Sequence, residues 1–226
     1  MDTWRDTAPH ILPPVVIQLG DTCWAVSYIH QMEATVRLQP NLNLPVDQHL
    51  SIQEFINILP RGYREYHGTI HGSSYAIDTL TRLGTVLDTV CPLTFALDTP
   101  GRTPQHPRVK RFYLAEMDPH YLAWYQHEYE EFGSDLFEHL LEERAKITPV
   151  TIRIPSCGSF ETCATMGTVY DPSDDELAYA NMMEYGHFLL LLGPVIIDGV
   201  PCWECQDSSG YSVNGRVYIR RKCEAI

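Results

Sequence analysis

The sequence has 226 residues, of which 44% are hydrophobic, and its 16 basic and 29 acidic side chains give a formal charge of −13. A chain of this size buries a substantial hydrophobic core without cross-links. Its negative charge repels phosphate backbones and anionic lipid surfaces, which argues against nucleic acid as a partner. The apolar runs fall well short of the ~20 residues that span a bilayer. We therefore expect a soluble, folded chain with no membrane-spanning helix.

The amino-terminal residues and the cysteines bear on the cellular compartment. Residues 1–6 include two aspartates and no apolar segment, so no secretory signal is recognisable and the chain as written is expected in the cytoplasm. Seven cysteines leave at least one unpaired if the others form disulfides. An unpaired cysteine fits either a reactive thiol or a reducing compartment.

The first strong structural signal is a helix over residues 23–38. This segment contains neither proline nor glycine and repeats apolar residues at helical spacing, which indicates a largely buried helix. Asp21 or Thr22 is expected to cap its first turn, and the Gln39-Pro40 pair ends it. Cys23 therefore opens the helix.

Further helices are expected on both sides of a loop rich in proline, glycine and threonine at 99–104. A capping-box pattern at 51–54 starts a helix that Pro60 closes, and another helix runs from 74 to 83 and stops at Gly84. After the loop, one more helix is expected over 134–146. The remaining signals are strands at 149–154, 187–197, 201–206 and 216–221. The pattern predicts an α+β fold.

Cys23 and His187 are the first candidates for chemistry. A thiolate at a helix amino terminus is favoured by the partial positive charge there, and a nearby imidazole accepts the thiol proton. Cysteine, histidine and a third polar residue, Asp207, follow one another in chain order. Taken alone, Cys23 in a buried helix and His187 on an apolar strand equally suit core packing, and Asp207 suits a turn.

The words around these residues resemble the papain-like cysteine peptidase family. The run Cys23-Trp24-Ala25-Val26-Ser27 is similar to the family's Cys-Trp-Ala-Phe-Ser, and residues 50–55 resemble its Leu-Ser-x-Gln second helix. Residues 71–74 stand where the family has an Asn-Gly-Gly turn. Residues 210–219 resemble its closing strand. The resemblance extends over residues 12–221.

This resemblance implies a papain-like two-lobe fold and a catalytic group. Residues 1–110 are then a mainly helical lobe that carries the nucleophile Cys23, and residues 111–226 are a mainly β, barrel-like lobe with His187 as general base and Asp207 in the place of the family's asparagine. Gln18 corresponds to the glutamine whose amide completes the oxyanion hole. The resemblance implies no metal and no cofactor. It also implies a monomer with a polypeptide substrate or peptide ligand in the cleft.

The resemblance further implies which residues line the substrate. Gly72 and Ser73 correspond to the turn beside the substrate, and Trp24, Phe188 and Arg153 complete the substrate-binding set. Arg153 and Phe188 would narrow the main side-chain pocket and favour acidic or small groups. We therefore expect this pocket to prefer acidic or small substrate side chains over bulky apolar ones.

Several departures set this chain apart as a divergent member. Only four residues separate Gln18 from Cys23 where the family has five, and Ser209 replaces the tryptophan that shields the imidazole pair. Ser73 replaces the second glycine of the substrate-side turn. No propeptide precedes the domain and the family's carboxyl-terminal return after Arg221 is missing, so either an unusual paralogue or a chain truncated at its carboxyl end is expected. Family members are often vacuolar, lysosomal or secreted, which leaves the compartment open.

Other functions compete with peptide-bond hydrolysis. A papain-fold pseudoenzyme would bind a peptide in its cleft without cleaving it, and a Cys-His-Asp acyltransferase such as a transglutaminase would use the same three residue types. Cysteines 157, 163, 202 and 205 are also compatible with a zinc site, but the Cys157–Cys163 spacing and the opposite faces of Cys202 and Cys205 on a strand favour core thiols or disulfides.

Overall fold

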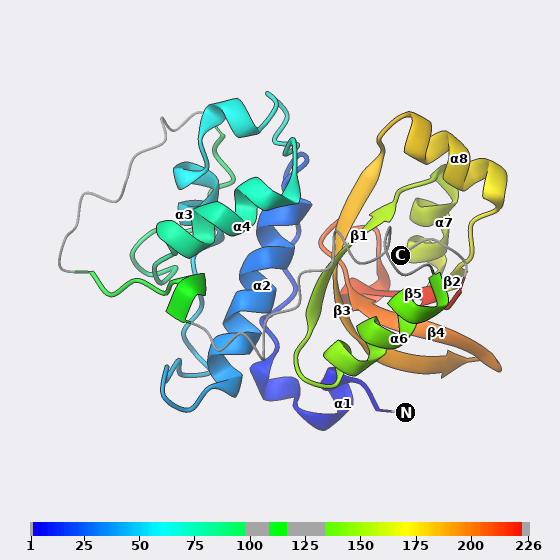
Figure 1. The fold of residues 1–226 in the computed structure, drawn as a ribbon, viewed down its shortest axis with the longest axis horizontal. Coiled ribbons are helices and arrows are strands. Elements are labelled where there is room, and N and C mark those ends of the chain that lie inside the picture. Colours follow the sequence, from blue (N-terminus) through cyan, green and yellow to red (C-terminus); the bar gives the residue numbers. More distant parts are fainter. Residues whose placement is uncertain (1, 98–108, 117–133, 223–226) are drawn as a thin grey trace.

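The computed structural model describes residues 2–97, 109–116 and 134–222. A helical part and a sheet part lie side by side, with the long helix α2 (Cys23–Leu38) along the boundary between them (Figure 1). The other helices of the helical part are α3 (Ile52–Ile58) and α4 (Ser73–Arg82), and the sheet part carries α6 (Ser134–Ala145), α7 (Gly158–Met166) and α8 (Asp174–Met182). A short helix, α1 (Trp4–Thr7), lies near the amino terminus. The predicted α+β class is confirmed.

Helix α2 begins and ends where the sequence predicts. Thr22 is its N-cap residue, but the Thr22 hydroxyl donates to the carbonyl of Leu19 at 3.0 Å and makes no side-chain cap bond. The expectation that Asp21 or Thr22 caps the first turn is therefore wrong. The backbone N–H groups of Ala25 and Val26 donate to the carbonyl of Thr22 at 3.0 and 3.3 Å. Among the described residues, those of Cys23 and Trp24 stay available for another acceptor.

The neighbouring helices follow their sequence signals closely. The Ser51 side chain accepts a hydrogen bond from the backbone N–H of Glu54 at 2.9 Å and so caps α3. The reciprocal half of the predicted capping box is absent, because the Glu54 carboxylate instead accepts a hydrogen bond from Arg111 at 2.9 Å. Helix α4 ends just before Gly84, which adopts the left-handed conformation expected of a residue after a helix.

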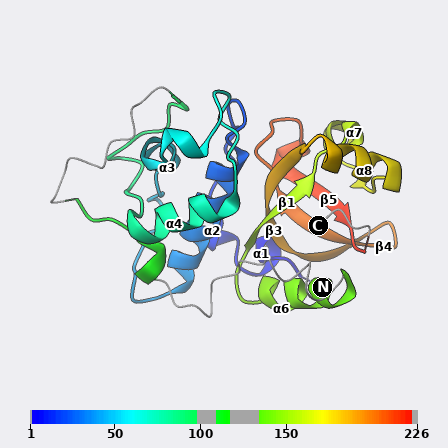
Figure 2. The same ribbon diagram turned by 45° about the horizontal axis from the view of Figure 1, so that its top comes forward.

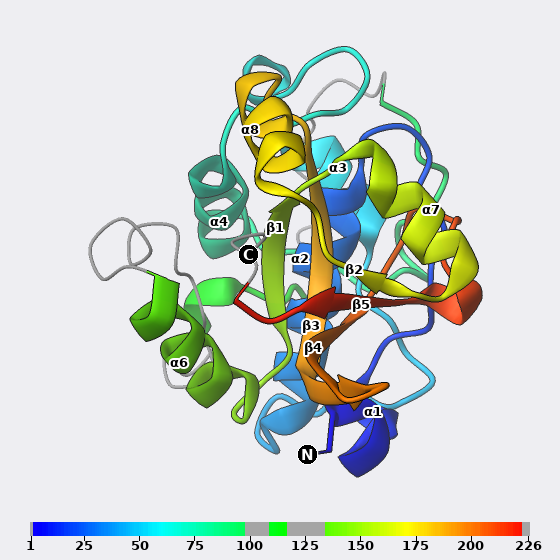
Figure 3. The same cartoon turned by 90° about the vertical axis from the view of Figure 1, so that its right-hand side faces the viewer.

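The sheet part is one mostly antiparallel sheet of five strands in the order β1-β3-β4-β5-β2. Its strands are β1 (Val150–Pro155), β2 (Val169–Tyr170), β3 (Gly186–Ile197), β4 (Val200–Gln206) and β5 (Arg216–Arg220), and only the β2–β5 pair is parallel. Helices α6, α7 and α8 cover the side of the sheet away from α2 (Figure 3). The four strands predicted from the sequence are confirmed within one or two residues, whereas α7, β2 and α8 were not predicted. The predicted loop at 99–104 lies outside the described residues.

Two hydrophobic cores lie on opposite sides of strands β1 and β3. The first core joins α2, α3 and α4, and the second fills the space between the sheet and helices α6, α7 and α8. Phe188 lies on β3 but packs in the first core. The hydroxyl of Thr151 on β1 donates to the carbonyl of Ser27 at 2.9 Å, and the backbone N–H of Thr151 donates to the Gln31 side chain at 2.8 Å. These contacts fix the first turns of α2 against the sheet.

The amino-terminal segment lies against the sheet part (Figure 2). The indole N–H of Trp4 donates to the carbonyl of Ala145 at 2.6 Å. The buried Glu204 on β4 accepts hydrogen bonds from the Thr3 hydroxyl at 2.9 Å and from Arg5 at 2.8 Å. Within the described residues, no helix is both long and apolar enough to cross a membrane.

Candidate active site

The candidate site forms where α2 begins and β3 starts. Cys23 is the first residue of α2, His187 is the second residue of β3, and Asp207 follows the last residue of β4. Since α2 packs directly on β3, residues that are 164 positions apart in the sequence become neighbours. The Cys23 thiol, which is buried and free of any disulfide, lies close enough to the His187 imidazole to raise the pKa of that ring through hydrogen bonding and charge. The structure thus brings together the three residues that the sequence singled out.

The imidazole of His187 is held between the thiol and a carboxylate. Its Nε2 atom lies 2.7 Å from Oδ1 of Asp207, and the two side chains are only 8% and 0% exposed. The ring of Phe160, on α7, lies 5.3 Å from the imidazole ring, centroid to centroid. Although Ser209 stands where the family has a shielding tryptophan, the hydrogen-bonded pair is buried. A low-dielectric environment of this kind strengthens the attraction between the two groups.

The protonation of this pair departs from ordinary values in opposite directions. Burial acts to lower the pKa of His187, but hydrogen bonds to Asp207 and Cys23 outweigh it and raise the pKa to about 9. Burial acts to raise the pKa of Asp207, whereas hydrogen bonds from His187, Ser209 and Ser212, with the charge of the imidazolium, lower it to about 2. The pair is therefore an imidazolium and a carboxylate at neutral pH.

Asp207 owes part of this state to the serines that follow it. Its Oδ1 atom accepts the backbone N–H of Ser209 at 3.0 Å, and its Oδ2 atom accepts the Ser209 hydroxyl at 2.5 Å. The backbone N–H of Asp207 donates to the carbonyl of Gly215 at 3.0 Å. Donors on both oxygens fix the plane of the carboxylate and so the direction of the bond to His187.

Gln18 is held by the residue after Asp207. Its backbone N–H donates to the carbonyl of Ser208 at 2.8 Å, and its Oε1 atom accepts the Ser208 hydroxyl at 2.8 Å. Its Nε2 atom donates to the carbonyl of Gly20 at 2.9 Å. A carbonyl only accepts, so this contact assigns the amide nitrogen to the Gly20 side. One of its two N–H bonds is occupied, and the other has no partner among the described residues.

The fold is similar to that of several solved protein structures. No family model and no curated protein matches this chain in sequence. Among solved structures, it is similar to bromelain protease from Ananas comosus in complex with the E64 inhibitor, with a TM-score of 0.66 and 15% identity over 99% of this chain and 90% of that one. It is also similar to procathepsin L2 from Tenebrio molitor larval midgut, with a TM-score of 0.68 and 18% identity over 98% of this chain and 62% of that one.

A third similar structure is the proform of Amb a 11, a ragweed pollen cysteine protease, with a TM-score of 0.64 and 14% identity over 98% of this chain. The chain has a papain-like fold. The likeness covers both the helical part and the sheet part, so the predicted two-lobe architecture is confirmed. The chain spans 60% of the Amb a 11 proform and 62% of procathepsin L2.

Within this papain-like fold, the residues expected to line a substrate lie in two settings. Trp24 is buried in the helical core, where its indole N–H donates to the carbonyl of Gly68 at 2.8 Å and its ring packs 5.0 Å from that of Phe55, centroid to centroid. Gly72 and Ser73 lie at the start of α4 and are only partly buried. The structure thus separates Trp24 from this partly exposed turn.

Phe188 and Arg153 are paired across strands β3 and β1 and so share one face of the sheet. The ring of Phe188 lies 5.8 Å from that of Tyr28, centroid to centroid, so this face is the one toward α2. Arg153 is exposed, and its guanidinium donates to the carbonyl of Glu184 at 3.0 Å.

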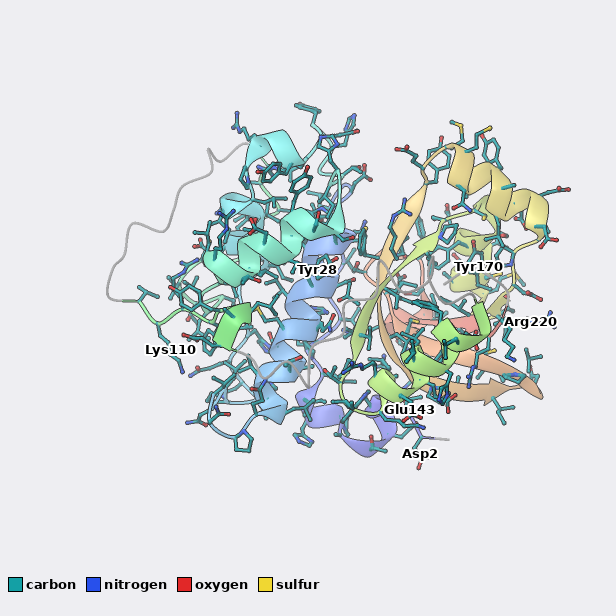
Figure 4. All side chains as sticks on the ribbon, in the orientation of Figure 1. Asp2, Tyr28, Lys110, Glu143, Tyr170 and Arg220 are labelled. Carbon is teal, nitrogen blue, oxygen red and sulfur yellow. The ribbon has the colours of Figure 1, made fainter. Side chains whose placement is uncertain are left out.

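Tyr28 joins these residues across the lobes and was not predicted. It lies between α2 and α4 (Figure 4), and its hydroxyl hydrogen-bonds to Ser73. Burial raises the pKa of Tyr28 to about 12, against the smaller opposing effect of Ser73, so the phenol is neutral. Its position five residues after Cys23 places it on another face of α2 than the thiol. Its tertiary contacts with Phe188 and Ser73 distinguish it from an ordinary core tyrosine.

Metal chemistry has no evident site in the described part of the chain. No three histidine, cysteine, aspartate or glutamate side chains there come together in a way that would hold an ion. The six described cysteines are free thiols, including Cys157, Cys163, Cys202 and Cys205. The seventh cysteine, Cys223, lies outside the described residues.

Proposed function

We propose that this chain is a cysteine-type peptidase that hydrolyses peptide bonds through an acyl-enzyme intermediate. The observation that carries the proposal is the chain of hydrogen bonds from the Cys23 thiol to the His187 imidazole and on to the Asp207 carboxylate. Its likeness to solved cysteine proteases supports the same conclusion through the fold.

The chemistry follows from the protonation of the three groups. In the resting state the proton of the Cys23 thiol resides on His187, and the thiolate is stabilised by the imidazolium and by the amino end of α2. The sulfur attacks the carbonyl carbon of a peptide bond, the imidazolium protonates the leaving amine, and a thioester remains on Cys23. Water, deprotonated by the imidazole, then releases the acid and restores the thiol. Asp207 holds the ring and stabilises its charge throughout.

The oxyanion of the tetrahedral intermediate needs donors beside the sulfur. We assign this role to the backbone N–H of Cys23, which opens α2, and to the remaining N–H of the Gln18 amide. The support for Gln18 is the hydrogen bonding to Ser208 and Gly20, which orients its amide. A donor fixed in advance costs no reorganisation during reaction.

The substrate side is assigned to Gly72 and Ser73 on one lobe and to Arg153 and Phe188 on the other. Phe188 fills space against Tyr28, and Arg153 offers a guanidinium at the same face of the sheet. This arrangement supports a preference for short or acidic side chains over bulky apolar ones. A peptide library whose best substrates all carry bulky apolar groups at every position would refute it. The buried Trp24 supports the wall from within the core.

The second candidate function is that of a peptide-binding pseudoenzyme. One observation favours it: the Gln18 amide nitrogen already donates to Gly20 within its own loop, which is one residue shorter than in the papain family. A glutamine held there rather than at the oxyanion would leave binding intact and turnover absent.

Covalent labelling separates the two functions. The protein is incubated with a peptide epoxide, and mass spectrometry locates any adduct. A peptidase gives an adduct on Cys23 that is lost in His187→Ala and retained in Cys91→Ala, a control at a half-buried thiol elsewhere. Absence of the Cys23 adduct in a folded protein, together with peptide binding, would establish the pseudoenzyme.

A further inference from the structure

The carboxyl end of α8 presents four large apolar or aromatic side chains to solvent. Tyr179, Met182, Met183 and Tyr185 are 55%, 72%, 42% and 50% exposed, and we call them the α8 patch. The opposite face of the helix is ordinary, because Leu177 and Ala180 are buried in the second core. Such a concentration of exposed apolar surface in seven residues marks an interaction site more often than chance.

The α8 patch is held by backbone hydrogen bonds. The N–H of Tyr185 donates to the carbonyl of Ala180 at 2.9 Å, and the N–H of Ser156 donates to the carbonyl of Tyr185 at 3.1 Å. The guanidinium of Arg153 donates to the carbonyl of Glu184 at 3.0 Å. The rings of Tyr179 and Tyr185 pack edge to face with centroids 6.4 Å apart. The patch is therefore preorganised and tied to the edge strand β1 at two points.

The position of the α8 patch points to its occupant. Tyr185 precedes His187 by two residues, and Figure 1 shows α8 leading directly into β3, which carries His187. An extended chain advances about 3.3 Å per residue, so the two residues from Tyr185 to His187 span about 7 Å, and a polypeptide whose scissile bond lies beside Cys23 and His187 passes close to this edge of the patch. The patch thus continues the proposed site along the path of a long substrate.

The charge around the α8 patch selects among substrate segments. Exposed Asp174 and Asp175 stand in the first turn of α8, and exposed Glu184 lies within the patch. The chain as a whole carries a formal charge of −13. Arg153, whose guanidinium donates to the carbonyl of Glu184, is a basic neighbour of the patch, but the three exposed carboxylates outnumber it. An apolar surface with this excess of negative charge matches a segment that carries an apolar side chain beside lysine or arginine.

We propose that the α8 patch binds a flanking segment of the polypeptide substrate, apolar with neighbouring basic residues, and so favours long substrates over short peptides. The inference rests on the proposed function for the location of the scissile bond. The interaction itself is a binding event and does not require turnover.

A binding experiment tests this inference independently of catalysis. The Cys23→Ala chain is titrated with a fluorescent short peptide and with the same peptide extended at either end by five residues that include leucine and two lysines. One extension is expected to tighten binding about tenfold, as burial of one large side chain would do. The gain in affinity is expected to vanish in the double variant Tyr179→Ser/Met182→Ser. It is expected to persist in the control variant Ile196→Ser, because Ile196 is a similarly exposed apolar side chain at the far end of β3.

The outcomes are distinct. Equal affinity for short and extended peptides would overturn the inference, as would a gain that survives in the double variant. If the native chain proves to be a dimer by sedimentation and the double variant a monomer, the patch is covered by a second copy and the inference is wrong. Loss of turnover alone, with the extension effect intact, would overturn the proposed function and leave the patch as a peptide-binding surface.

Discussion

Replacing Asp207 by asparagine tests the electrostatic core of the proposed site. The substitution keeps the shape of the side chain and its hydrogen bond to His187 but removes the negative charge that lies 2.7 Å from Nε2. The pKa of His187 in the wild-type chain is raised from 6.5 to about 9. At 1.36 kcal/mol per pKa unit, this corresponds to roughly 3 kcal/mol in favour of the imidazolium.

Asp207 and Cys23 share this stabilisation, so removing the carboxylate charge lowers the pKa of His187 by about 1 to 2 units. The alkaline limit of kcat/KM is expected to move down by the same amount in Asp207→Asn. The rate of Cys23 alkylation by iodoacetamide as a function of pH gives a second readout that needs no turnover. Asp78→Asn, at an exposed carboxylate on α4, is the matched control. An alkaline limit unmoved in Asp207→Asn would refute the reasoning.

The free energy of unfolding should depend on pH through the same two shifted pKa values. The raised pKa of His187 stabilises the folded chain fully below pH 6.5, and this contribution is lost as pH rises through 9. The lowered pKa of Asp207 contributes above pH 3.8 and is lost as pH falls through 2. The pair therefore stabilises the fold most between about pH 4 and 6.5. Urea unfolding should show a decline between pH 6.5 and 9 that is shallower in Asp207→Asn.

Three further substitutions follow from single contacts. Ser208→Ala frees the Gln18 amide and should lower kcat by up to about tenfold with little change in KM, since one neutral hydrogen bond contributes about 1 kcal/mol. Phe188→Ala leaves a cavity in the helical core and should cost about 3–5 kcal/mol in urea unfolding. Glu204→Gln removes the charge from a buried pair with Arg5 and should cost about 3 kcal/mol, measured as a lower Tm.

Each of these has a matched comparison. Ser209→Ala removes a hydroxyl from Asp207 rather than from Gln18, so a kcat effect equal in both variants would contradict a specific role of Ser208. Ile196→Ala, at an exposed position of β3, should change stability by less than about 0.5 kcal/mol. Arg82→Ala breaks an exposed ion pair on α4 and should leave the Tm nearly unchanged.

Sequence patterns predicted those elements whose signals are local. The proline-free run from Cys23 and the continuous apolar run after His187 specify α2 and β3 almost to the residue. Helix α8 was missed although Ser173 and Glu176 form a capping box, with hydrogen bonds in both directions. Its buried face consists of only Leu177 and Ala180, so the apolar period was too weak to reveal the helix beside its exposed aromatic residues.

The site was predictable in its members and less so in its supports. Cys23, His187 and Asp207 are recognisable by their residue types, by their order along the chain and by the sequence motifs around them. Their second partners depend on side-chain contacts between distant strands and loops: Ser208 reaches Gln18 across 190 positions, and Phe160 reaches His187 from a helix the sequence did not predict. The replacement of the family's shielding tryptophan by Ser209 suggests that water reaches the His187–Asp207 pair. The structure shows instead that other residues bury the pair.

The position of Gln18 follows from the sheet rather than from α2. The loop of four residues between Gln18 and Cys23 suggests that the glutamine is displaced, since a loop sets the distance between its ends. Yet the segment before Gln18 is bound along β4 and its extension: Glu204 accepts Thr3, Gln206 donates to the carbonyl of Pro13 at 3.2 Å, and Ser208 makes two hydrogen bonds to Gln18.

Glu204 and Gln206 alternate along β4 and so share a face, and Ser208 lies two residues past the end of the strand, so the three residues act as successive anchors. The last anchor lies next to Asp207, which holds His187. Gln18 and His187, the proposed oxyanion donor and general base, are therefore both positioned by the same point of the sheet, whatever the length of the loop. A shorter loop between Gln18 and Cys23 changes the path of the backbone into Cys23. It leaves the position of Gln18 relative to His187 unchanged. Loss of an early anchor, as in Glu204→Gln, should therefore lower kcat as well as the Tm.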